Sequence, residues 1–468
     1  MTAEPARHIL IVGGGASGTL LAVHLLRRAG TDICVTLVEK REHLGEGFAY
    51  GEAQPMHLLN VRASNISAYP DAPDHFVEWL DRNAIREGVT GEGRFRFAPR
   101  LTYGRYLAEQ LQEAADVPSN RHRFARVQDE AIAVSRGAHG IAVTLASGQT
   151  LAGDIAVIAT GYEAPRRSRL PLALPTWQPI DAEWIEEIDS VLILGTGHSA
   201  LDHIQLLLAA GYRGSMTAIS RRGLLPAVHR PVNAEVIDRG DLPLARKMSE
   251  IWHWLRARSE AAAAQRGTDW RAVLDGLRPH MQAIWLSLAP EERRRFLRHA
   301  RPWWEVRRHR MAPSVAATLN DLRDSGRLAV IAAKIVSIEG TGRSVEVAYR
   351  RRGAAENERL RVQAIIDCTG FSLDAASSRN AVARSLIDGG LARPDPLGLG
   401  FDVDASGALL AVGGAAAVDL FAIGPLTRGG LWETVGIPDI RVQCALLAER
   451  LSSSAAPGNS GRHDHLHR

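Results

Sequence analysis

A chain of 468 residues is long enough for two or three domains with sizeable hydrophobic cores. Its apolar content of 46% and charged content of 23% are typical of a globular protein, and a net charge of +4 is too small to indicate a nucleic-acid surface. Three widely separated cysteines without a C-x-x-C pair exclude a disulfide framework, a zinc site and a dithiol redox centre.

The first apolar run leads directly into a glycine turn, ILIVGGGASG, over residues 9–18. Gly13, Gly15 and Gly18 have the G-x-G-x-x-G spacing of a dinucleotide site. In such a site the first glycine forms a tight turn, the second lets the backbone approach the pyrophosphate, and the third lets the helix pack closely on the strand. We expect a buried strand, this turn, and then a helix over residues 19–29 whose N-terminus faces phosphate.

A second apolar strand, VTLVE, ends in Glu39, which lies 26 residues after Gly13. A carboxylate at this position accepts hydrogen bonds from ribose hydroxyls and repels a 2′-phosphate. A glycine-rich loop over residues 44–51 and the segment 57–67 follow, and we expect them to wrap the cofactor. Three strand-like runs then end in Ala159-Thr160-Gly161, a turn of small residues that lets the backbone pass close to a nucleotide.

The same pattern restarts at residue 191 with VLILGTGHSALD. Gly195, Gly197 and Ala200 have the G-x-G-x-x-A spacing, and the residue 26 positions after Gly195 is Arg221, followed by Arg222. A guanidinium pair favours a 2′-phosphate, so we expect this second site to prefer NADPH to NADH. The alternative is that the two arginines are ordinary surface residues.

Residues 242–325 are rich in Ala, Arg, Glu, Leu and Trp and predict a helical insert. Two interpretations stay open: a cap that supplies core or oligomer contacts, and a lid that shapes a substrate pocket. A second set of strand-like runs ends in Cys368-Thr369-Gly370, which mirrors the earlier closure. The last elements are a strand at 420–423, Gly424-Pro425 and a helix at 438–451, whose N-terminus can face the edge of a reduced flavin.

These elements predict an α/β fold with two Rossmann-like dinucleotide-binding domains. Two such units indicate two nucleotide cofactors. The predicted parts are a FAD domain formed by residues 1–180 and 365–451, an NADPH domain over residues 181–364 that carries the insert 242–325, and a disordered tail over residues 452–468.

The chain resembles bacterial FAD/NAD(P)-binding proteins of the hydroxylase-like kind, which are similar in layout to class B flavin-dependent monooxygenases. The segments that carry the resemblance are ILIVGGGASGTLLAVHLL, GEGFAYG with HLLNVRASNIS, SRRGLLP, RRHRMAP, RPDPLGLG and LFAIGPLTRGGLWETVGIPDIR. Together they extend from Ile9 to about Leu451. The Baeyer–Villiger fingerprint F-x-G-x-x-x-H-x-x-x-W does not occur, which argues against ester-forming oxygenation.

The resemblance and the spacing together imply FAD and NADPH as cofactors. The residues expected to bind FAD are Gly13, Gly15, Ala16, Ser17, Gly18, Glu39, Lys40, Gly47, Tyr50, His57, Asn60, Val127, Thr160, Gly161, Gly424 and Pro425. Those expected to bind NADPH are Gly195, Gly197, His198, Ser199, Arg221 and Arg222. No catalytic residue is assigned, although His57, Asn60 and Arg62 are candidate hydrogen-bond donors beside the flavin by position.

The resemblance implies a monooxygenase-like enzyme that passes one oxygen atom from a flavin C4a-hydroperoxide to an amine or thioether of a small molecule. Two alternatives stay open: a dehydrogenase or reductase that does not insert oxygen, and a non-catalytic redox sensor. The expected partners are the small-molecule substrate and molecular oxygen, without metal, membrane or nucleic acid. No signal peptide or membrane-spanning run is found, so we expect a cytoplasmic protein, and its oligomeric state is left open.

Overall fold

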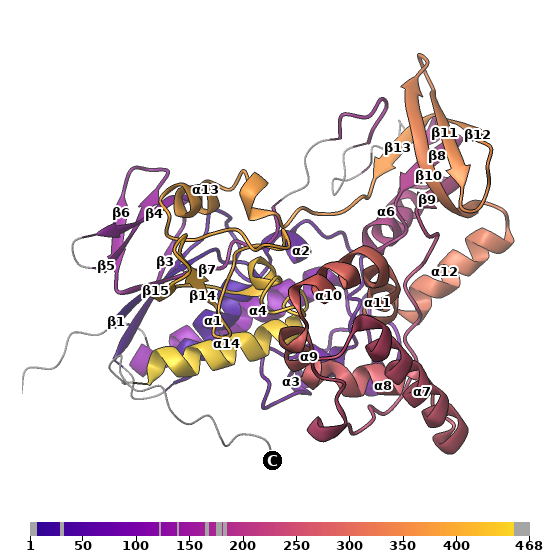
Figure 1. Cartoon of the computed structure of the whole chain (residues 1–468). Helices are drawn as coiled ribbons and strands as arrows, with labels where there is room; N and C mark the ends of the chain where they lie inside the picture. The colour runs from indigo at the N-terminus through magenta and orange to yellow at the C-terminus, as the bar shows by residue number, and fades with distance from the viewer. Residues whose placement is uncertain are drawn as a thin grey trace, which may run out of the picture.

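The computed structural model describes residues 7–28, 32–120, 123–137, 140–163, 168–174, 180 and 185–453. Over these residues the chain forms two six-stranded sheets and a small three-stranded sheet, with helices around them (Figure 1). The predicted α/β class with two Rossmann-like units is confirmed.

The first unit is built from both ends of the chain. Its sheet has the spatial order β14 (Ala408–Leu410), β15 (Ala416–Ala422), β7 (Ile155–Ile158), β1 (Arg7–Val12), β2 (Ile33–Val38) and β3 (Phe124–Val127). The central strand β1 pairs in parallel with β2 and β7, with Ile9 opposite Val35 and Ile155. Continuous apolar runs suit these strands because a parallel sheet is covered on both faces.

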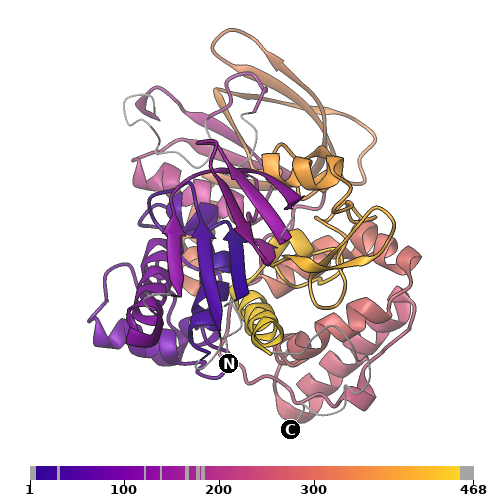
Figure 2. The ribbon, with the colours of Figure 1, turned by 90° about the vertical axis from the view of Figure 1, so that its left-hand side faces the viewer.

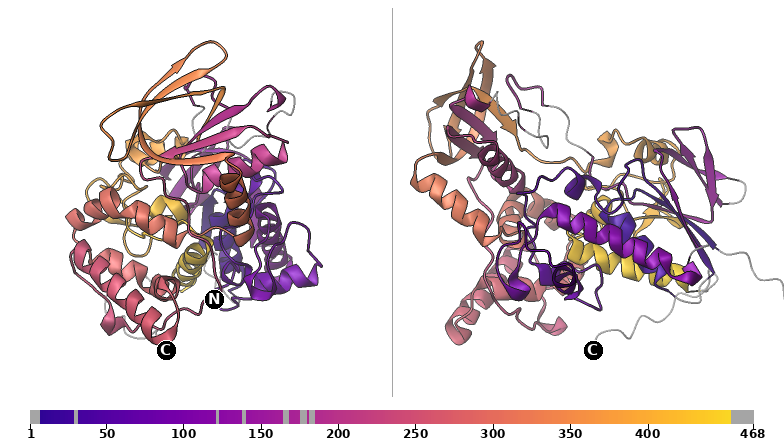
Figure 3. Two further views of the ribbon diagram at one scale, coloured as in Figure 1. Left: turned by 90° about the vertical axis from the view of Figure 1, so that its right-hand side faces the viewer. Right: turned by 180° about the vertical axis from the view of Figure 1, so that it is seen from behind.

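Helix α1 (Ala16–Leu26) is buried from Ser17 to Leu26 and packs against both α4 (Arg100–Asp116) and α14 (Ile437–Ser452). A helix that is apolar all round belongs in a core, which is why this segment needs helices on its outer side. The view from behind shows the purple helix α4 and the yellow helix α14 side by side (Figure 3). The other helices of this unit are α2 (Gly47–Gly51), α3 (His75–Arg82) and α13 (Ala381–Asp388).

The small antiparallel sheet packs against α13 through its first strand. Its strands are β4 (Ala131–Gly137), β5 (Gly140–Leu145) and β6 (Thr150–Gly153). Short 3-10 helices join the larger elements of the chain at η1 (Ala63–Asn65), η2 (Gly93–Phe95), η3 (Pro118–Asn120), η4 (Arg239–Asp241), η5 (Arg278–His280), η7 (Ala375–Ser377) and η8 (Gly424–Thr427).

The second unit repeats the order of strand, glycine turn and helix. Its sheet has the spatial order β12 (Glu358–Val362), β11 (Val345–Arg351), β10 (Leu328–Gly340), β9 (Ser215–Ser220), β8 (Ser190–Leu194) and β13 (Ala364–Asp367). Strand β8 pairs in parallel with β9 and β13. Helix α6 (His198–Ala209) follows β8, and α12 (Pro313–Asp324) precedes β10.

The limits of the second unit differ from the predicted ones. Strand β13 pairs with β8, so residues 365–367 lie in the second sheet and not in the returning part of the first unit. Helix α12 places Val315 and Leu319 in the core of the second sheet, so it is a helix of this unit and not of the insert. Composition alone cannot separate two neighbouring helical segments that pack on different partners. The residues around the predicted boundary at 180–181 (175–179 and 181–184) and the tail after residue 453 lie outside the described residues.

The insert leaves and rejoins the second unit at Val228 and Met311, which pair with each other. Its helices are α7 (Met248–Arg266), α8 (Trp270–Leu277), α9 (Met281–Ser287), α10 (Pro290–Arg295), the π-helix η6 (Phe296–Ala300) and α11 (Arg301–Arg308). Its hydrophobic core includes Leu399 and Trp432 of the first unit. The insert therefore lies beside the first unit and below the second sheet (Figures 1 and 2).

Candidate functional site

The first glycine turn joins β1 to α1. Gly13 has a φ of +108°, and a Cβ atom there would lie 2.6 Å from the carbonyl oxygen of Ala159. A Cβ atom on Gly18 would lie 1.9 Å from the carbonyl oxygen of Gly13. Both clashes are with backbone that other strands and helices hold, so these two positions require glycine.

The second glycine turn, between β8 and α6, repeats this geometry. Gly195 has a φ of +113°, and a Cβ atom there would lie 2.6 Å from the carbonyl oxygen of Cys368. Ala159 and Cys368 each precede a Thr-Gly pair, so the same closure supports both turns. Apart from its own neighbours in the chain, no heavy atom of the described residues lies within 4 Å of the Cβ position of Gly197, so there is open space at this position.

A glycine is the N-cap residue of both helices that follow the turns, Gly15 before α1 and Gly197 before α6. Neither helix has a side chain that caps its N-terminus, and neither has an acidic residue in its first turn. The first backbone N–H groups are therefore available to an anion, and the helix dipole favours one. These residues fit the pyrophosphate groups of two dinucleotides.

Glu39 follows β2 and reaches back over the first glycine turn. Its Oε2 accepts a hydrogen bond from the backbone N–H of Gly14 (2.7 Å), and its Oε1 accepts one from that of Arg41 (3.0 Å). Val127 at the end of β3 accepts a hydrogen bond from the Glu39 N–H at 3.0 Å. The next residue, Lys40, instead forms an exposed ion pair with Glu130 at 2.9 Å.

The two arginines of the second unit have different surroundings. Arg221 is exposed and has no hydrogen bond or ion pair with the residues that the structure describes. Arg222 donates a hydrogen bond from Nη2 to the carbonyl oxygen of His299 in the insert, at 3.1 Å. One guanidinium of the pair therefore faces solvent at the edge where a cofactor is expected, and the other binds the insert.

The loop after β2 closes on the first glycine turn. The Cβ position of Gly15 lies 3.3 Å from the Cα of Gly47, where α2 begins. The carbonyl oxygen of Gly47 accepts a hydrogen bond from Arg41 Nη1 at 2.6 Å. Tyr50 is buried in the core and packs edge-on against Tyr103. Gly47 thus lies at the turn, whereas the Tyr50 ring packs against α4.

The segment after β15 lies against the start of α1. A Cβ atom on Gly424 would lie 2.4 Å from the Oγ of Ser17. Ser17 is buried and follows Ala16, the first residue of α1. Pro425 is buried in η8. Thr160 and Gly161 leave β7 beside Gly13, since a Cβ atom on Gly13 would lie 3.0 Å from the Thr160 nitrogen. These residues, far apart in sequence, surround one end of α1.

His57 and Asn60 lie at the junction of the two units. His57 is 1% exposed. Its Nδ1 accepts a hydrogen bond from the Gln54 N–H at 3.1 Å, so the proton of the neutral ring is on Nε2. Nε2 donates to the carbonyl oxygen of Asp202 on α6, also at 3.1 Å. Burial lowers the pKa of His57, which keeps the ring neutral. The Asn60 carbonyl oxygen accepts a hydrogen bond from His229 Nε2 at 3.0 Å.

A buried ion pair strengthens this junction and could not be foreseen from the sequence. Arg100 at the start of α4 and Asp202 on α6 lie 2.8 Å apart, with side chains that are 14% and 5% exposed. Residues 100 and 202 have no local pattern that pairs them. Tertiary contact alone brings them together.

His198 and Ser199 form the first turn of α6. The Nε2 of His198 lies 3.0 Å from the carbonyl oxygen of His309, at the end of α11. Burial lowers the pKa of His198, so the ring is neutral and donates this hydrogen bond. The carbonyl oxygen of Ser199 accepts from His203 Nδ1 at 2.7 Å.

The equivalent Thr-Gly closures of the two units are each followed by an aromatic residue, and these two residues meet. The rings of Tyr162 and Phe371 are 5.4 Å apart, and Phe48 of α2 packs edge-on against Phe371 at 5.2 Å. The repeated motif is visible in the sequence, so both aromatic residues were available as candidates. Burial raises the pKa of Tyr162.

The insert is joined to the first unit by buried charges. Glu305 of α11 accepts from Arg428 at 2.6 Å, and Arg308 lies 3.0 Å from Glu433. Asp439, near the start of α14, pairs with Arg278 at 3.0 Å and with Arg308 at 3.3 Å. Burial alone would raise the pKa of Glu305, but Arg428 and then Arg301 lower it to about 2.

Tryptophans complete this contact. Trp285 donates from Nε1 to the carbonyl oxygen of Gly429 at 2.7 Å and stacks on Trp432 with a ring separation of 4.6 Å. Trp304 donates from Nε1 to Glu433 at 3.1 Å. The insert is therefore fixed on the segment between β15 and α14, where the end of the FAD site was predicted.

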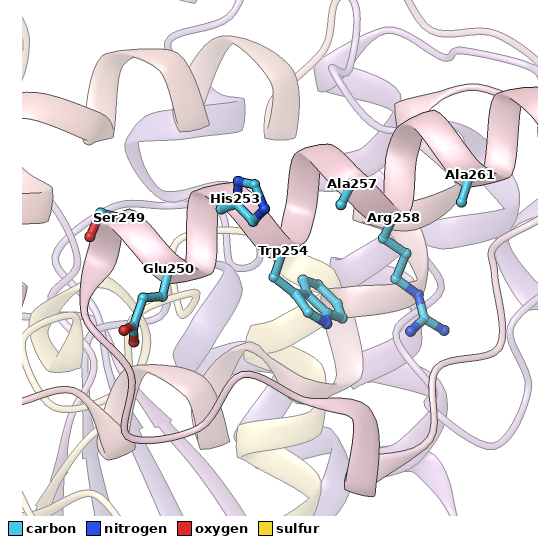
Figure 4. Close-up of a pocket in the computed structure, with 7 residues that line it drawn as sticks. All are labelled: Ser249, Glu250, His253, Trp254, Ala257, Arg258 and Ala261. Atoms are coloured by element: carbon cyan, nitrogen blue, oxygen red, sulfur yellow. The ribbon is translucent and has the colours of Figure 1, made fainter.

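Two hollows lie in the insert and not at the glycine turns. One is an open hollow of about 670 Å³ on the outer face of α7 (Figure 4). It is lined by Ser249, Glu250, His253, Trp254, Ala257, Arg258 and Ala261. The other is an apolar cavity of about 50 Å³ between α7, α9 and Trp432.

Among the residues described, no helix is long and apolar enough to cross a membrane. The same part of the chain has no group of three His, Cys, Asp or Glu side chains arranged to hold a metal ion.

A family model described as FAD-NAD(P)-binding matches residues 10–163, which contain the first glycine turn, Glu39 and the first Thr-Gly closure. No curated protein is similar in sequence to this chain. Residues 10–163 are thus an FAD-NAD(P)-binding domain, and they form the larger part of the first unit.

Several solved structures have the same fold over nearly the whole chain. The ornithine N-hydroxylase of Kutzneria sp. 744, in a structure with reduced FAD, NADP⁺ and L-ornithine, is 15% identical, covers 96% of this chain and 100% of its own, and has a TM-score of 0.58. The cadaverine monooxygenase of Erwinia amylovora is 12% identical, with 98% and 99% coverage and a TM-score of 0.62. The L-lysine 6-monooxygenase of Pseudomonas syringae is 16% identical, with 95% and 99% coverage and a TM-score of 0.59.

The match of the family model and the shared fold agree with the paired glycine turns described above. The chain carries an FAD-NAD(P)-binding domain and has the fold of flavin-dependent N-hydroxylating monooxygenases.

Proposed function

We propose that this protein is an FAD-dependent oxidoreductase that consumes NADPH and hydroxylates nitrogen or sulfur in a small molecule. One observation carries the proposal: two glycine turns of the same geometry are followed, at the same distance in sequence, by Glu39 in one unit and Arg221 in the other. A carboxylate suits the free ribose hydroxyls of FAD, and a guanidinium suits the 2′-phosphate of NADPH.

The fold supports the choice of reaction. The similar structures come from proteins whose names state N-hydroxylation or monooxygenation of ornithine, lysine and cadaverine. All three substrates carry a primary amine. We therefore propose a small-molecule amine as the first substrate class to test, with molecular oxygen as the second substrate.

FAD, when bound, supplies hydride acceptance and the activation of oxygen. The chain's own residues hold and orient it. The N–H groups at the start of α1 receive the pyrophosphate, Glu39 receives the ribose, and the N-terminus of α14 favours negative charge on the flavin edge. The insert is held against the segment after β15 by hydrogen bonds of Glu305 and Trp304, so it would cover that side of the bound cofactor.

The cysteines do not fit the mechanism of a dithiol reductase. Cys34, Cys368 and Cys444 are all free, and burial raises the pKa of Cys368 and of Cys444 well above the usual thiol range. A thiol with such a pKa is not a nucleophile near neutral pH. Free cysteines also fit a reducing compartment, which supports the proposed cytoplasmic location.

The test uses the FAD-loaded protein with NADPH, ¹⁸O₂ and a panel of diamines, amino acids and thioethers. We expect one panel member to accelerate NADPH oxidation and to yield a product that contains one ¹⁸O atom. Oxidation of NADPH that yields hydrogen peroxide for every panel member would instead identify a reductase. A flavin that NADPH does not reduce under anaerobic conditions would leave only a binding protein.

A further inference from the structure

The turn that follows β9 holds two adjacent arginines with different partners. Arg221 is exposed and unpaired among the described residues. The guanidinium of Arg222 donates to the His299 carbonyl oxygen at 3.1 Å and lies 5.6 Å from the centre of the Trp303 ring. Arg307 also lies 5.6 Å from the centre of this ring, so two arginines lie near Trp303. Arg222 therefore contacts both the start and the middle of one helical segment of the insert.

That segment is α11 together with the π-helix η6 before it. His299 lies in η6, and π-turns of this kind are rare and occur often at functional sites. At the other end of α11, the carbonyl oxygen of His309 accepts the hydrogen bond from His198 Nε2 at 3.0 Å. The segment 299–309 is thus anchored at both ends to the second unit.

Both anchors are on the edge of the second unit where a dinucleotide is expected. His198 is the first residue of α6, directly after Gly197, and Arg222 follows the residue expected at the 2′-phosphate. The outer side of the same helix holds the first unit through Glu305–Arg428 and Arg308–Glu433. Helix α11 thus lies between the two predicted cofactor sites.

The glycine turn and the arginine turn are themselves joined. Thr196, between the two glycines, donates from Oγ1 to the Leu224 carbonyl oxygen at 2.6 Å and lies 2.9 Å from the Oγ of Ser220. The Oγ of Ser220 in turn accepts from the Gly223 N–H at 2.9 Å. These bonds enclose Arg221 and Arg222, so a ligand that orders one part of the turn orders the other.

We propose that Arg222 is a positioning residue that anchors α11 over the NADPH edge, and that Arg221 alone discriminates the 2′-phosphate. The inference rests on the proposed function, because it takes NADPH as the ligand of the second unit. It implies that a nucleotide with a 2′-phosphate, bound at Arg221, stabilises the turn that also holds α11. NADP⁺ then protects the insert more than NAD⁺ does.

The experiment compares the FAD-loaded wild type with Arg221→Ala, Arg222→Ala and Arg222→Lys. Calorimetric titration gives the Kd for NADP⁺ and for NAD⁺, and limited trypsin digestion gives the rate of cleavage within residues 293–310, a segment rich in arginine. We expect Arg221→Ala to weaken NADP⁺ binding about tenfold or more and to leave NAD⁺ binding unchanged, since a charge-assisted contact is lost.

For Arg222→Ala we expect the opposite result, with a small effect on nucleotide binding and a large effect on cleavage. We expect less than about a threefold change in the Kd for NADP⁺, several-fold faster cleavage of the ligand-free insert, and loss of the protection by saturating NADP⁺. Arg222→Lys keeps a donor and the charge but not the planar contact with Trp303, so it protects in part. If Arg222→Ala does not fold, Trp303→Leu removes the stacking surface instead and gives the same cleavage pattern.

The proposal is overturned if Arg222→Ala weakens NADP⁺ as much as Arg221→Ala does while the cleavage rate stays that of the wild type. Both arginines would then be phosphate ligands. A wild type that binds neither nucleotide would contradict the proposed function. In that case the cleavage rates without ligand still test whether Arg222 anchors α11. A failure of this inference can therefore be distinguished from a failure of the proposed function.

Discussion

The two nucleotide units of this protein share backbone geometry and differ in side chains. Gly13 and Gly195 have φ values of +108° and +113°, and each would place a Cβ atom 2.6 Å from the carbonyl oxygen that precedes a Thr-Gly closure. The residues expected to face a ligand differ, with Glu39 in one unit and Arg221 in the other. The backbone needed to form a phosphate-binding turn is constant, whereas the residue that selects the nucleotide is free to change.

The third position of the turn shows a second difference, with Gly18 in the first unit and Ala200 in the second. A Cβ atom on Gly18 would lie 1.9 Å from a backbone oxygen, whereas the second unit accommodates a Cβ at the equivalent position. The reason is packing, because α1 is held between the sheet, α4 and α14 and cannot move outward. Because α1 is buried on all sides, the first unit does not tolerate a Cβ atom at the third position of the turn.

The largest effect is expected at this third position. Gly18→Ala forces α1 away from β1, so we expect a loss of about 3 kcal/mol or more in the free energy of unfolding and a protein purified with little FAD. Urea unfolding and flavin absorbance measure the two effects. The matched control is Ala200→Gly, for which helix propensity alone predicts a loss of about 1 kcal/mol. Equal losses for the two variants would contradict the packing difference.

The junction between the units comes next. Asp202→Asn removes the buried carboxylate that faces Arg100 and leaves a guanidinium without its counter-charge, so we expect a loss of about 3 kcal/mol in unfolding free energy. A double variant with Arg100→Met should recover part of this loss, since neither charge is then buried alone. A single variant as stable as the wild type in urea would show that the pair does not join the units.

The smallest effect is a pH dependence of stability, which comes from His229 at this junction and from Glu305 at the contact of the insert with the first unit. Burial lowers the pKa of His229 to about 3, whereas an unfolded histidine has a pKa of about 6.5. Between these values the unfolded chain binds more protons than the native one, so stability falls as the pH drops from 6.5 toward 3. Glu305, with a pKa of about 2, contributes stability above the unfolded glutamate pKa, which is lost as the pH falls through about 4.5 toward 2.

The two groups can be separated by the pH range. Of these two groups, the histidine is the one that contributes between pH 7 and pH 5. His229→Gln, which keeps a donor for the Asn60 carbonyl oxygen, should therefore reduce the slope of Tm against pH. Differential scanning calorimetry at pH 7, 6 and 5 measures this slope. An unchanged slope would place the acid sensitivity at other buried histidines, among them His24, whose pKa burial lowers to about 4.

The two units and the residues that distinguish them follow from local patterns in the sequence. Glycines at fixed spacing, apolar runs before them and Thr-Gly pairs after them are local patterns, and local sterics decide what they form. The presence of a helix after the first glycine turn, the end of α14 and the contrast between Glu39 and Arg221 were therefore predictable. The bounds of that helix were not, because α1 covers Ala16–Leu26 and not residues 19–29. Each is set by residues close together in the chain or by an equal offset in a repeat.

The packing of distant segments against each other does not follow from such local patterns. The sequence could not show that α12 belongs to the second sheet, that His57 is buried against α6, or that Arg222 contacts the insert while Arg221 does not. His57 and its partner Asp202 are 145 positions apart, and Arg222 and its partner His299 are 77 positions apart. No periodic pattern in the sequence links residues at such distances. Which side of a helix is buried, and which arginine of a pair meets a partner, depends on the surface that the rest of the chain presents.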